Sequence, residues 1–133
     1  MSTLAKSKEL LTRYSIARIP FIAVNTIERT RVLGVLKEIS EELSLTFYVH
    51  SLSKGLYDSV SGKKISDDKS YYGAIEFMSE QMKRRNYMTL ILTEIPDLST
   101  DNSDARQIID LVTLADESGG AVIVLTNNPI WNQ

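Results

Sequence analysis

The sequence predicts an α/β protein of three layers, in which helices cover both faces of a four-stranded parallel sheet. Four short apolar runs recur along the chain, and nearly continuous hydrophobicity is typical of strands that are buried on both faces. Segments with helical apolar spacing precede and separate these runs. With 133 residues the chain is long enough for a sizeable core, so we expect residues 1–133 to form a single α/β domain.

The first half of the chain supplies two helices and two strands. Residues 3–16 are expected to form the first helix, and the apolar run "IPFIAVN" over 19–25 the first strand. Residues 28–43 predict the second helix, whose apolar positions recur at helical spacing: Val32, Val35, Leu36, Ile39 and Leu43. The segment "LTFYVH", residues 45–50, is rich in aromatic and β-branched residues and predicts the second strand.

The second half repeats this alternation after a long connection. A polar, glycine-containing stretch over 51–69 is predicted to be irregular, and residues 70–85 predict the third helix. The run "YMTLILTEI", 87–95, predicts the third strand. The last helix is expected over 104–117 and ends at "ESGG", because glycine readily adopts the left-handed conformation of a helix end. The run "AVIVLTNN", 121–128, predicts the fourth strand.

The composition excludes several kinds of site and partner. There is no cysteine, so neither a disulfide nor a thiolate metal site can form, and His50 is the single histidine. A net charge of −2 argues against a nucleic-acid binder, which usually has a basic excess. The N-terminal residues lack a signal-peptide pattern and no long apolar run occurs, so we expect a cytoplasmic protein without membrane contact. No metal and no cofactor are expected.

The stretch "GLYDSVSGKK", residues 55–64, raises the question of a phosphate-binding loop. Such a loop needs a first glycine five residues before its Gly-Lys and a hydroxyl residue after it. Aligned on Gly62 and Lys63, those two positions hold Tyr57 and Lys64. The stretch also lies in a long connection instead of joining a strand directly to a helix N-terminus. It is therefore predicted to be a surface loop, and nucleotide binding by residues 54–64 is the alternative.

A phosphate loop would belong after the first strand, in the connection "VNTIERTR" over 24–31. This connection has no glycine and no lysine. Asn25, Thr26 and the first-turn amides of the following helix could hold an anion weakly, since the helix dipole favours negative charge there. The favoured interpretation is a helix cap, with Asn25 and Glu28 as a capping pair.

Residues 17–56 resemble the N-terminal region of a group of AAA ATPases related to a conserved hypothetical reading frame of plastid genomes and common in cyanobacteria. That region runs from an Arg-x-Pro into an apolar strand, then through a Thr-x-Glu-x-x-Arg signature to a strand before Gly-Leu. The matching residues here are Arg18, Pro20, Thr26, Glu28, Arg31, Ser51, Gly55 and Leu56. The resemblance continues more loosely through "YMTLILTEIPDL" and "AVIVLTNNP", so it covers nearly the whole chain.

The resemblance implies a P-loop-type core that has lost its Walker A motif and that precedes a working AAA module. Thr93 would stand where a Walker B aspartate binds magnesium, Glu94 in the catalytic-glutamate position and Asn127 in the sensing position. Together with Asn25 and Thr26, Glu94 and Asn127 would form a vestigial nucleotide site. The implied strand order is 2-3-4-1 or 2-3-1-4, and the resemblance favours the first of these.

Several further residues are candidates for a role in contacts or chemistry. Glu28 and Arg31 can pair on one helix face, either as a solvated pair or as a contact to a partner. Ile130 and Trp131 near the chain end can fold back on the sheet or face a partner. His50 ends the second strand and is predicted to be half-buried with one hydrogen bond, without a catalytic role.

Charged groups outside these positions favour a structural interpretation. Asp67, Asp68, Asp101 and Asp104 are the two carboxylate pairs that precede helices, where aspartate is a preferred cap. The basic run at 83–85 lies at a helix end, where cations complement the dipole.

We therefore expect a non-catalytic module that acts through protein–protein or inter-domain contacts, either with an AAA module or by self-association. The alternative is a nucleotide-binding protein or ATPase that uses the loop at 54–64. A receiver-type signalling module is disfavoured, because the only acidic candidates near strand ends are Glu94 and Asp97.

Overall fold

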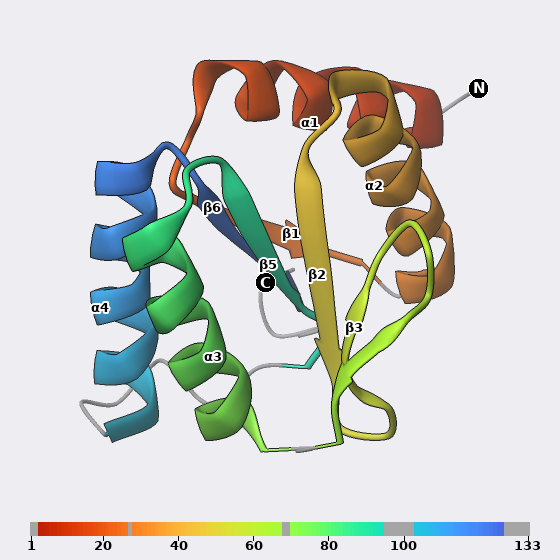
Figure 1. Ribbon diagram of the computed structural model, residues 1–133. Coiled ribbons are helices and arrows are strands. Elements are labelled where there is room, and N and C mark those ends of the chain that lie inside the picture. Colours follow the sequence, from red (N-terminus) through yellow and green to blue (C-terminus); the bar gives the residue numbers. More distant parts are fainter. Residues whose placement is uncertain (1–2, 27, 68–69, 95–102, 127–133) are drawn as a thin grey trace, which may run out of the picture.

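A computed structural model describes residues 3–26, 28–67, 70–94 and 103–126 (Figure 1). These residues form four helices and six strands, and the strands form one mixed sheet. The elements in chain order are α1 (Thr3–Ala17), β1 (Phe21–Asn25), α2 (Arg29–Leu43), β2 (Thr46–Ser51), β3 (Gly55–Asp58), β4 (Lys64–Ser66), α3 (Tyr71–Arg84), β5 (Met88–Leu92), α4 (Ser103–Ser118) and β6 (Ala121–Thr126).

The strand order across the sheet is β1-β6-β5-β2-β3-β4. The four expected strands β1, β6, β5 and β2 pair in parallel, in the order 2-3-4-1 that the resemblance favours. The expected four-stranded sheet is nevertheless too small. Two antiparallel strands, β3 and β4, extend it beyond β2.

The prediction that residues 51–69 are irregular is therefore wrong. Glycine and polar residues give this stretch no apolar alternation that a local pattern could reveal. Its strands form because β3 pairs along β2 and places Leu56, which is fully buried, in the core. The turn and the tertiary pairing, not the local composition, create this hairpin.

Helices cover both faces of the sheet and separate two apolar clusters. Leu11 of α1 and the buried face of α2 pack on one face, against residues such as Phe47 and Ile123. On the other face α3 and α4 pack against residues such as Leu90 and Val122. Figure 1 shows these two helix pairs on either side of the strands. The expected three-layer α/β arrangement is confirmed.

Three helices end with a residue in the left-handed conformation. Gly119 after α4 has φ of 73°, and the Gly120 N–H donates to the Ala115 carbonyl at 2.8 Å, the bond typical of a glycine-ended helix. Arg18 after α1 (φ 58°) and Ser44 after α2 (φ 55°) end their helices in the same way, without glycine. The predicted role of "ESGG" is confirmed, whereas the other two ends gave no glycine signal in the sequence.

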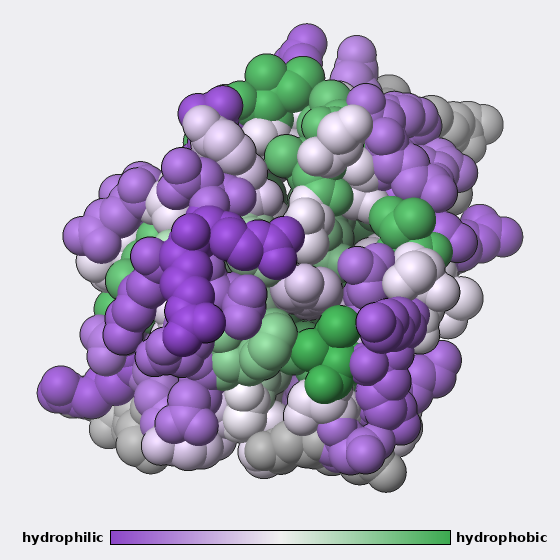
Figure 2. Space-filling model, viewed as in Figure 1, coloured by the Kyte–Doolittle hydropathy of each residue, from purple (hydrophilic) through white to green (hydrophobic). Residues whose placement is uncertain are grey.

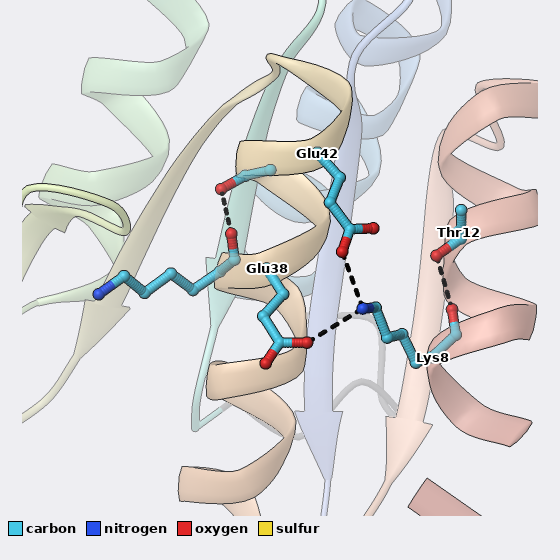
Figure 3. A network of polar contacts seen from close by, with 6 residues as sticks. Lys8, Thr12, Glu38 and Glu42 are labelled. Atoms are coloured by element: carbon cyan, nitrogen blue, oxygen red, sulfur yellow. Dashed lines mark hydrogen bonds and ion pairs between the residues drawn. The ribbon is translucent and has the colours of Figure 1, made fainter. Parts of the chain in front are cut away.

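A charged contact joins α1 to α2. Lys8 Nζ lies 2.9 Å from Glu42 Oε2 and 3.1 Å from Glu38 Oε1, as Figure 3 shows. The hydrogen bonds to Glu42 and then to Glu38 raise the pKa of Lys8 above its ordinary value. This exposed contact links the two helices that cover one face of the sheet.

On the face seen in Figure 2, hydrophilic side chains dominate the margins, where the helices and the hairpin meet solvent. Hydrophobic side chains are visible mainly between these margins. None of the described helices is both long and apolar enough to cross a lipid bilayer.

Candidate functional site

The predicted nucleotide-site residues lie at the carboxyl ends of the parallel strands. Asn25 ends β1, and Glu94 follows β5. Strand β6 lies between β1 and β5, so the two residues are separated by two strand spacings, about 10 Å. Both residues thus lie at the carboxyl ends of their strands, but they are not in contact. Asn127 lies outside the described residues.

The connection from β1 to α2 is short, and Thr26 bonds through both its N–H and its hydroxyl. The Thr26 N–H donates to the Thr126 carbonyl at 2.7 Å, which continues the β1–β6 pairing. The Thr26 hydroxyl then accepts the Glu28 N–H at 2.9 Å. The helix N-cap is Glu28, and its side chain makes no capping bond. In the described part of this connection, both the N–H and the hydroxyl of Thr26 are engaged in contacts within the protein.

The expected capping pair of Asn25 and Glu28 is wrong. Asn25 is still part of β1 and pairs with Thr126, so its backbone runs along the sheet instead of turning into the helix. The Thr26 hydroxyl bonds the N–H of the N-cap residue itself. The pattern of a cap residue followed by an acidic residue therefore predicts the wrong cap, because Asn25 still belongs to the strand and Glu28 is itself the N-cap residue.

Glu94 is tied to the turn between β2 and β3. Its Oε1 accepts the Leu52 N–H at 3.0 Å and lies 3.2 Å from the Thr93 hydroxyl. The turn is closed further by the Ser51 hydroxyl, which accepts the Lys54 N–H at 3.0 Å. The carboxylate therefore anchors a turn that precedes the hairpin, and one of its oxygens is committed to this task.

Thr93 links the end of β5 to the end of β2 through two contacts with one backbone carbonyl. Its N–H donates to the His50 carbonyl at 3.1 Å, and its hydroxyl lies 3.1 Å from the same oxygen. Thr93 is 5% exposed. A hydroxyl has one proton to donate, which the His50 carbonyl and Glu94 Oε1 share. The residue at the expected magnesium position thus serves a buried contact within the protein.

His50 is fully buried, so the prediction of a half-buried histidine is wrong. The sequence placed it correctly in β2, where it pairs with Leu56 on one side and Leu92 on the other. Strand β3, which the sequence pattern missed, pairs along the other flank of β2, so His50 lies in an interior strand and not at the edge of the sheet.

The Gly-Lys stretch forms the turn of the β3–β4 hairpin. Asp58 Oδ1 accepts the N–H groups of Val60 at 2.8 Å and Ser61 at 3.0 Å. The Gly62 N–H donates to the Asp58 carbonyl, and the Lys63 N–H donates to the Ser61 hydroxyl. The amides that could wrap a phosphate are instead bonded within the turn, with the Asp58 carboxylate in the place of an anion.

The ion pair expected between Glu28 and Arg31 is present at the surface. Glu28 and Arg31 lie 3.4 Å apart, with side chains that are 52% and 67% exposed. Exposed pairs of this kind contribute at most about 1 kcal/mol. Glu80 lies near both Lys83 and Arg84 at the end of α3. An interface role for Glu28 and Arg31 stays a prediction.

Several sequence candidates lie outside the described residues: Asp68, Asp101, Ile130 and Trp131. Asp67 is described and pairs with Lys64 at 2.9 Å. Within the described ranges, no group of three His, Asp or Glu side chains is arranged to hold a metal ion.

A pocket of about 360 Å³ lies at the other ends of the parallel strands, where these strands begin. It is lined by the residues that end three helices, among them Arg18, Ser44 and Gly119. The Arg18 guanidinium lies 4.2 Å from the centre of the Tyr87 ring, a cation–π contact. The sequence does not predict this pocket, because its residues come from four separate connections and share no local pattern.

A family model, SpoVK-like AAA ATPase, N-terminal domain, matches residues 7–130. No curated protein and no solved structure matches the chain. The match spans both helical layers and all six strands, so it covers the elements that carry the candidate site. The chain therefore belongs to the family of SpoVK-like AAA ATPase N-terminal domains.

Proposed function

We propose that residues 1–133 act as one α/β module that works by contact with an AAA module or another protein, without a Walker A/B site of its own. One observation carries the proposal: Thr26, Thr93 and one carboxylate oxygen of Glu94, all at the described part of the predicted nucleotide site, are bonded within the protein. The Thr93 hydroxyl contacts the His50 carbonyl, and Glu94 accepts the Leu52 N–H. The Thr26 hydroxyl accepts the Glu28 N–H at the start of α2. A nucleotide would have to displace these bonds to be held there.

The parallel strand order supports a P-loop NTPase-like origin of the module. In this interpretation the Walker A loop has been replaced by the short connection Thr26–Glu28, which lacks glycine and lysine. The cytoplasmic location, the absence of nucleic-acid and membrane partners, and the kinship with the plastid and cyanobacterial group belong to the same proposal.

Calorimetric titration of ATP with magnesium into the purified chain tests the missing nucleotide site. We expect no binding at micromolar concentrations, for the wild type and for Lys63→Ala alike. Micromolar binding that Lys63→Ala abolishes would instead establish the alternative, nucleotide binding by the turn at 54–64. Binding that survives Lys63→Ala but is lost in Glu94→Gln would place a nucleotide at the strand ends and overturn the proposal.

A binding assay with a separately produced AAA module of a SpoVK-like ATPase tests the contact itself. We expect saturable association that weakens in Arg31→Ala, because Arg31 is exposed near the carboxyl edge of the sheet. Lys83→Ala is the matched control, since Lys83 also sits in an exposed i, i+3 pair with a glutamate but at the end of α3. Equal loss in both variants would point to a general charge effect and remove Arg31 from the interface.

A further inference from the structure

Strand β1 forms one edge of the sheet, and no described strand pairs with its outer side. The bonds at its two ends fix which residues face β6. The Val122 N–H donates to the Pro20 carbonyl at 2.9 Å, and the Thr26 N–H donates to the Thr126 carbonyl at 2.7 Å. In a parallel pair, every second residue directs both its N–H and its C=O to the same neighbour. The even-numbered residues of β1 therefore bond to β6.

The three odd-numbered residues, Phe21, Ala23 and Asn25, direct their backbone groups to the open side. Their side chains are also exposed, so neither the strand edge nor this face of β1 is covered by the described chain. None of the three is charged. Natural proteins usually blunt such an edge with lysine, proline, a bulge or a very short strand, because an open edge is a template for pairing.

The helices do not compensate for this exposure. Ile22 is buried and Val24 packs partly beneath α1 and α2. No residue of β1 belongs to the cluster beneath α3 and α4. Phe21 remains 37% exposed and the preceding Ile19 remains 38% exposed. The outer face of β1 therefore offers an apolar surface beside a row of open hydrogen-bonding groups.

We propose that β1 pairs with β1 of a second copy of this chain, in an antiparallel arrangement centred on Ala23. In this register Ala23 lies opposite itself and Phe21 lies opposite Asn25 of the second copy. Every outward N–H and C=O of the strand then has a partner, since hydrogen-bonded antiparallel pairs exchange two bonds. The small side chain at the centre lets the two strands approach, and the two sheets continue as one.

The composition of β1 supports a second copy as the partner strand. None of its five residues is charged. No side chain of the strand therefore meets its own like charge at the symmetry axis, where such a contact would be unfavourable.

Disulfide trapping with Ala23→Cys tests the register. The chain has no cysteine, so a single introduced thiol can link only to another copy. Opposed residues of a hydrogen-bonded antiparallel pair have Cα atoms about 5.5 Å apart, within the range of about 4.4–6.8 Å that disulfides span. We expect mild oxidation to link Ala23→Cys at least tenfold faster than Val60→Cys, an exposed control site in the hairpin turn. Equal rates for the two variants would overturn the proposal.

Sedimentation of variants without a cysteine gives an independent measurement. We expect the wild type to dimerise with rising concentration, Ala23→Lys to weaken the dimer at least tenfold, and Val60→Lys to leave it unchanged. A wild type that stays monomeric at millimolar concentration overturns the proposal. So does a dimer that Ala23→Lys leaves intact.

Hydrogen exchange separates a second copy from another occupant and does not depend on a variant's folding. We expect the amides of Phe21, Ala23 and Asn25 to gain protection as the protein concentration rises. Protection that is complete in dilute, monomeric protein would mean that the chain covers its own edge, and would reject the second copy as the occupant.

Discussion

The two edges of the sheet differ in length, charge and regularity. Strand β4 closes one edge with three residues, carries Lys64 and pairs irregularly with β3. Strand β1 forms the other edge with five uncharged residues in regular register with β6. Short length, lysine and an irregular register are the features that prevent strands from pairing with other chains. The hairpin edge thus has features that discourage pairing with another chain, and the five residues of β1 lack them.

The difference also extends to the polar groups beside each edge. On the hairpin side, Asp58 and Glu94 use their carboxylates to bond backbone N–H groups of turns. On the β1 side, the described contacts at the strand end are those of Thr26 and Thr126 with neighbouring backbone. The turns on the hairpin side are thus held by charge-assisted bonds within the chain, whereas no described strand pairs with the outward backbone groups of β1.

The largest expected effect follows from truncating the buried side chain that holds the hairpin. Leu56 of β3 is fully buried, so Leu56→Ala should lower the free energy of unfolding by about 2–5 kcal/mol. Phe21→Ala on β1, measured in dilute protein, should cost well under that, because the side chain is 37% exposed. Urea denaturation of both variants measures the difference. Equal costs would show that β1 is covered and would remove the contrast between the edges.

A smaller effect is expected from Asp58→Ala, which removes the acceptor of two turn amides. The loss should destabilise the hairpin by about 1–2 kcal/mol. Hydrogen exchange should show faster exchange at Val60 and Ser61, with the β1 amides unchanged. Asp58→Asn is the control, because its carbonyl oxygen can still accept both bonds. If Asp58→Ala leaves the Val60 and Ser61 amides protected, the carboxylate does not hold the turn.

The smallest effect concerns the alkaline limit of stability, to which the α1–α2 contact and the hairpin both contribute. Hydrogen bonds to Glu42 and Glu38 raise the pKa of Lys8 above 10.5, and burial raises the pKa of Tyr57 above 10.0. A group whose pKa is raised on folding binds its proton more tightly in the folded state. Its contribution is therefore complete below the unfolded pKa and is lost as the pH rises through about 10 and above.

Thermal unfolding between pH 8 and pH 11.5 measures this loss. The melting temperature should decline over that range in the wild type. Tyr57→Phe should flatten the part of the decline that begins near pH 10, and Lys8→Met the part that begins near pH 10.5. High salt should weaken the Lys8 share, since that contact is exposed. Variants that decline as steeply as the wild type would contradict these assignments.

The positions of the helices and of the parallel strands followed from the sequence. Apolar residues at helical spacing and nearly continuous apolar runs are local patterns, and each expected element lies within three residues of its observed bounds. The α/β class follows from their alternation. The end of α4 was also predictable, because Gly119 adopts a left-handed conformation that glycine tolerates without steric cost.

Only the tertiary structure decided the features that depend on pairing between distant segments. Strand β3 forms because β2 offers an edge, and this pairing places His50 in an interior strand of the sheet. Glu94 finds the Leu52 amide 42 residues away in the chain. The strand order leaves β1 at an open edge, although its sequence looks like that of a strand buried on both faces. The spacing of apolar residues along the chain predicts which side chains are suited to burial. The order of the strands in the sheet determines which of these side chains are actually buried.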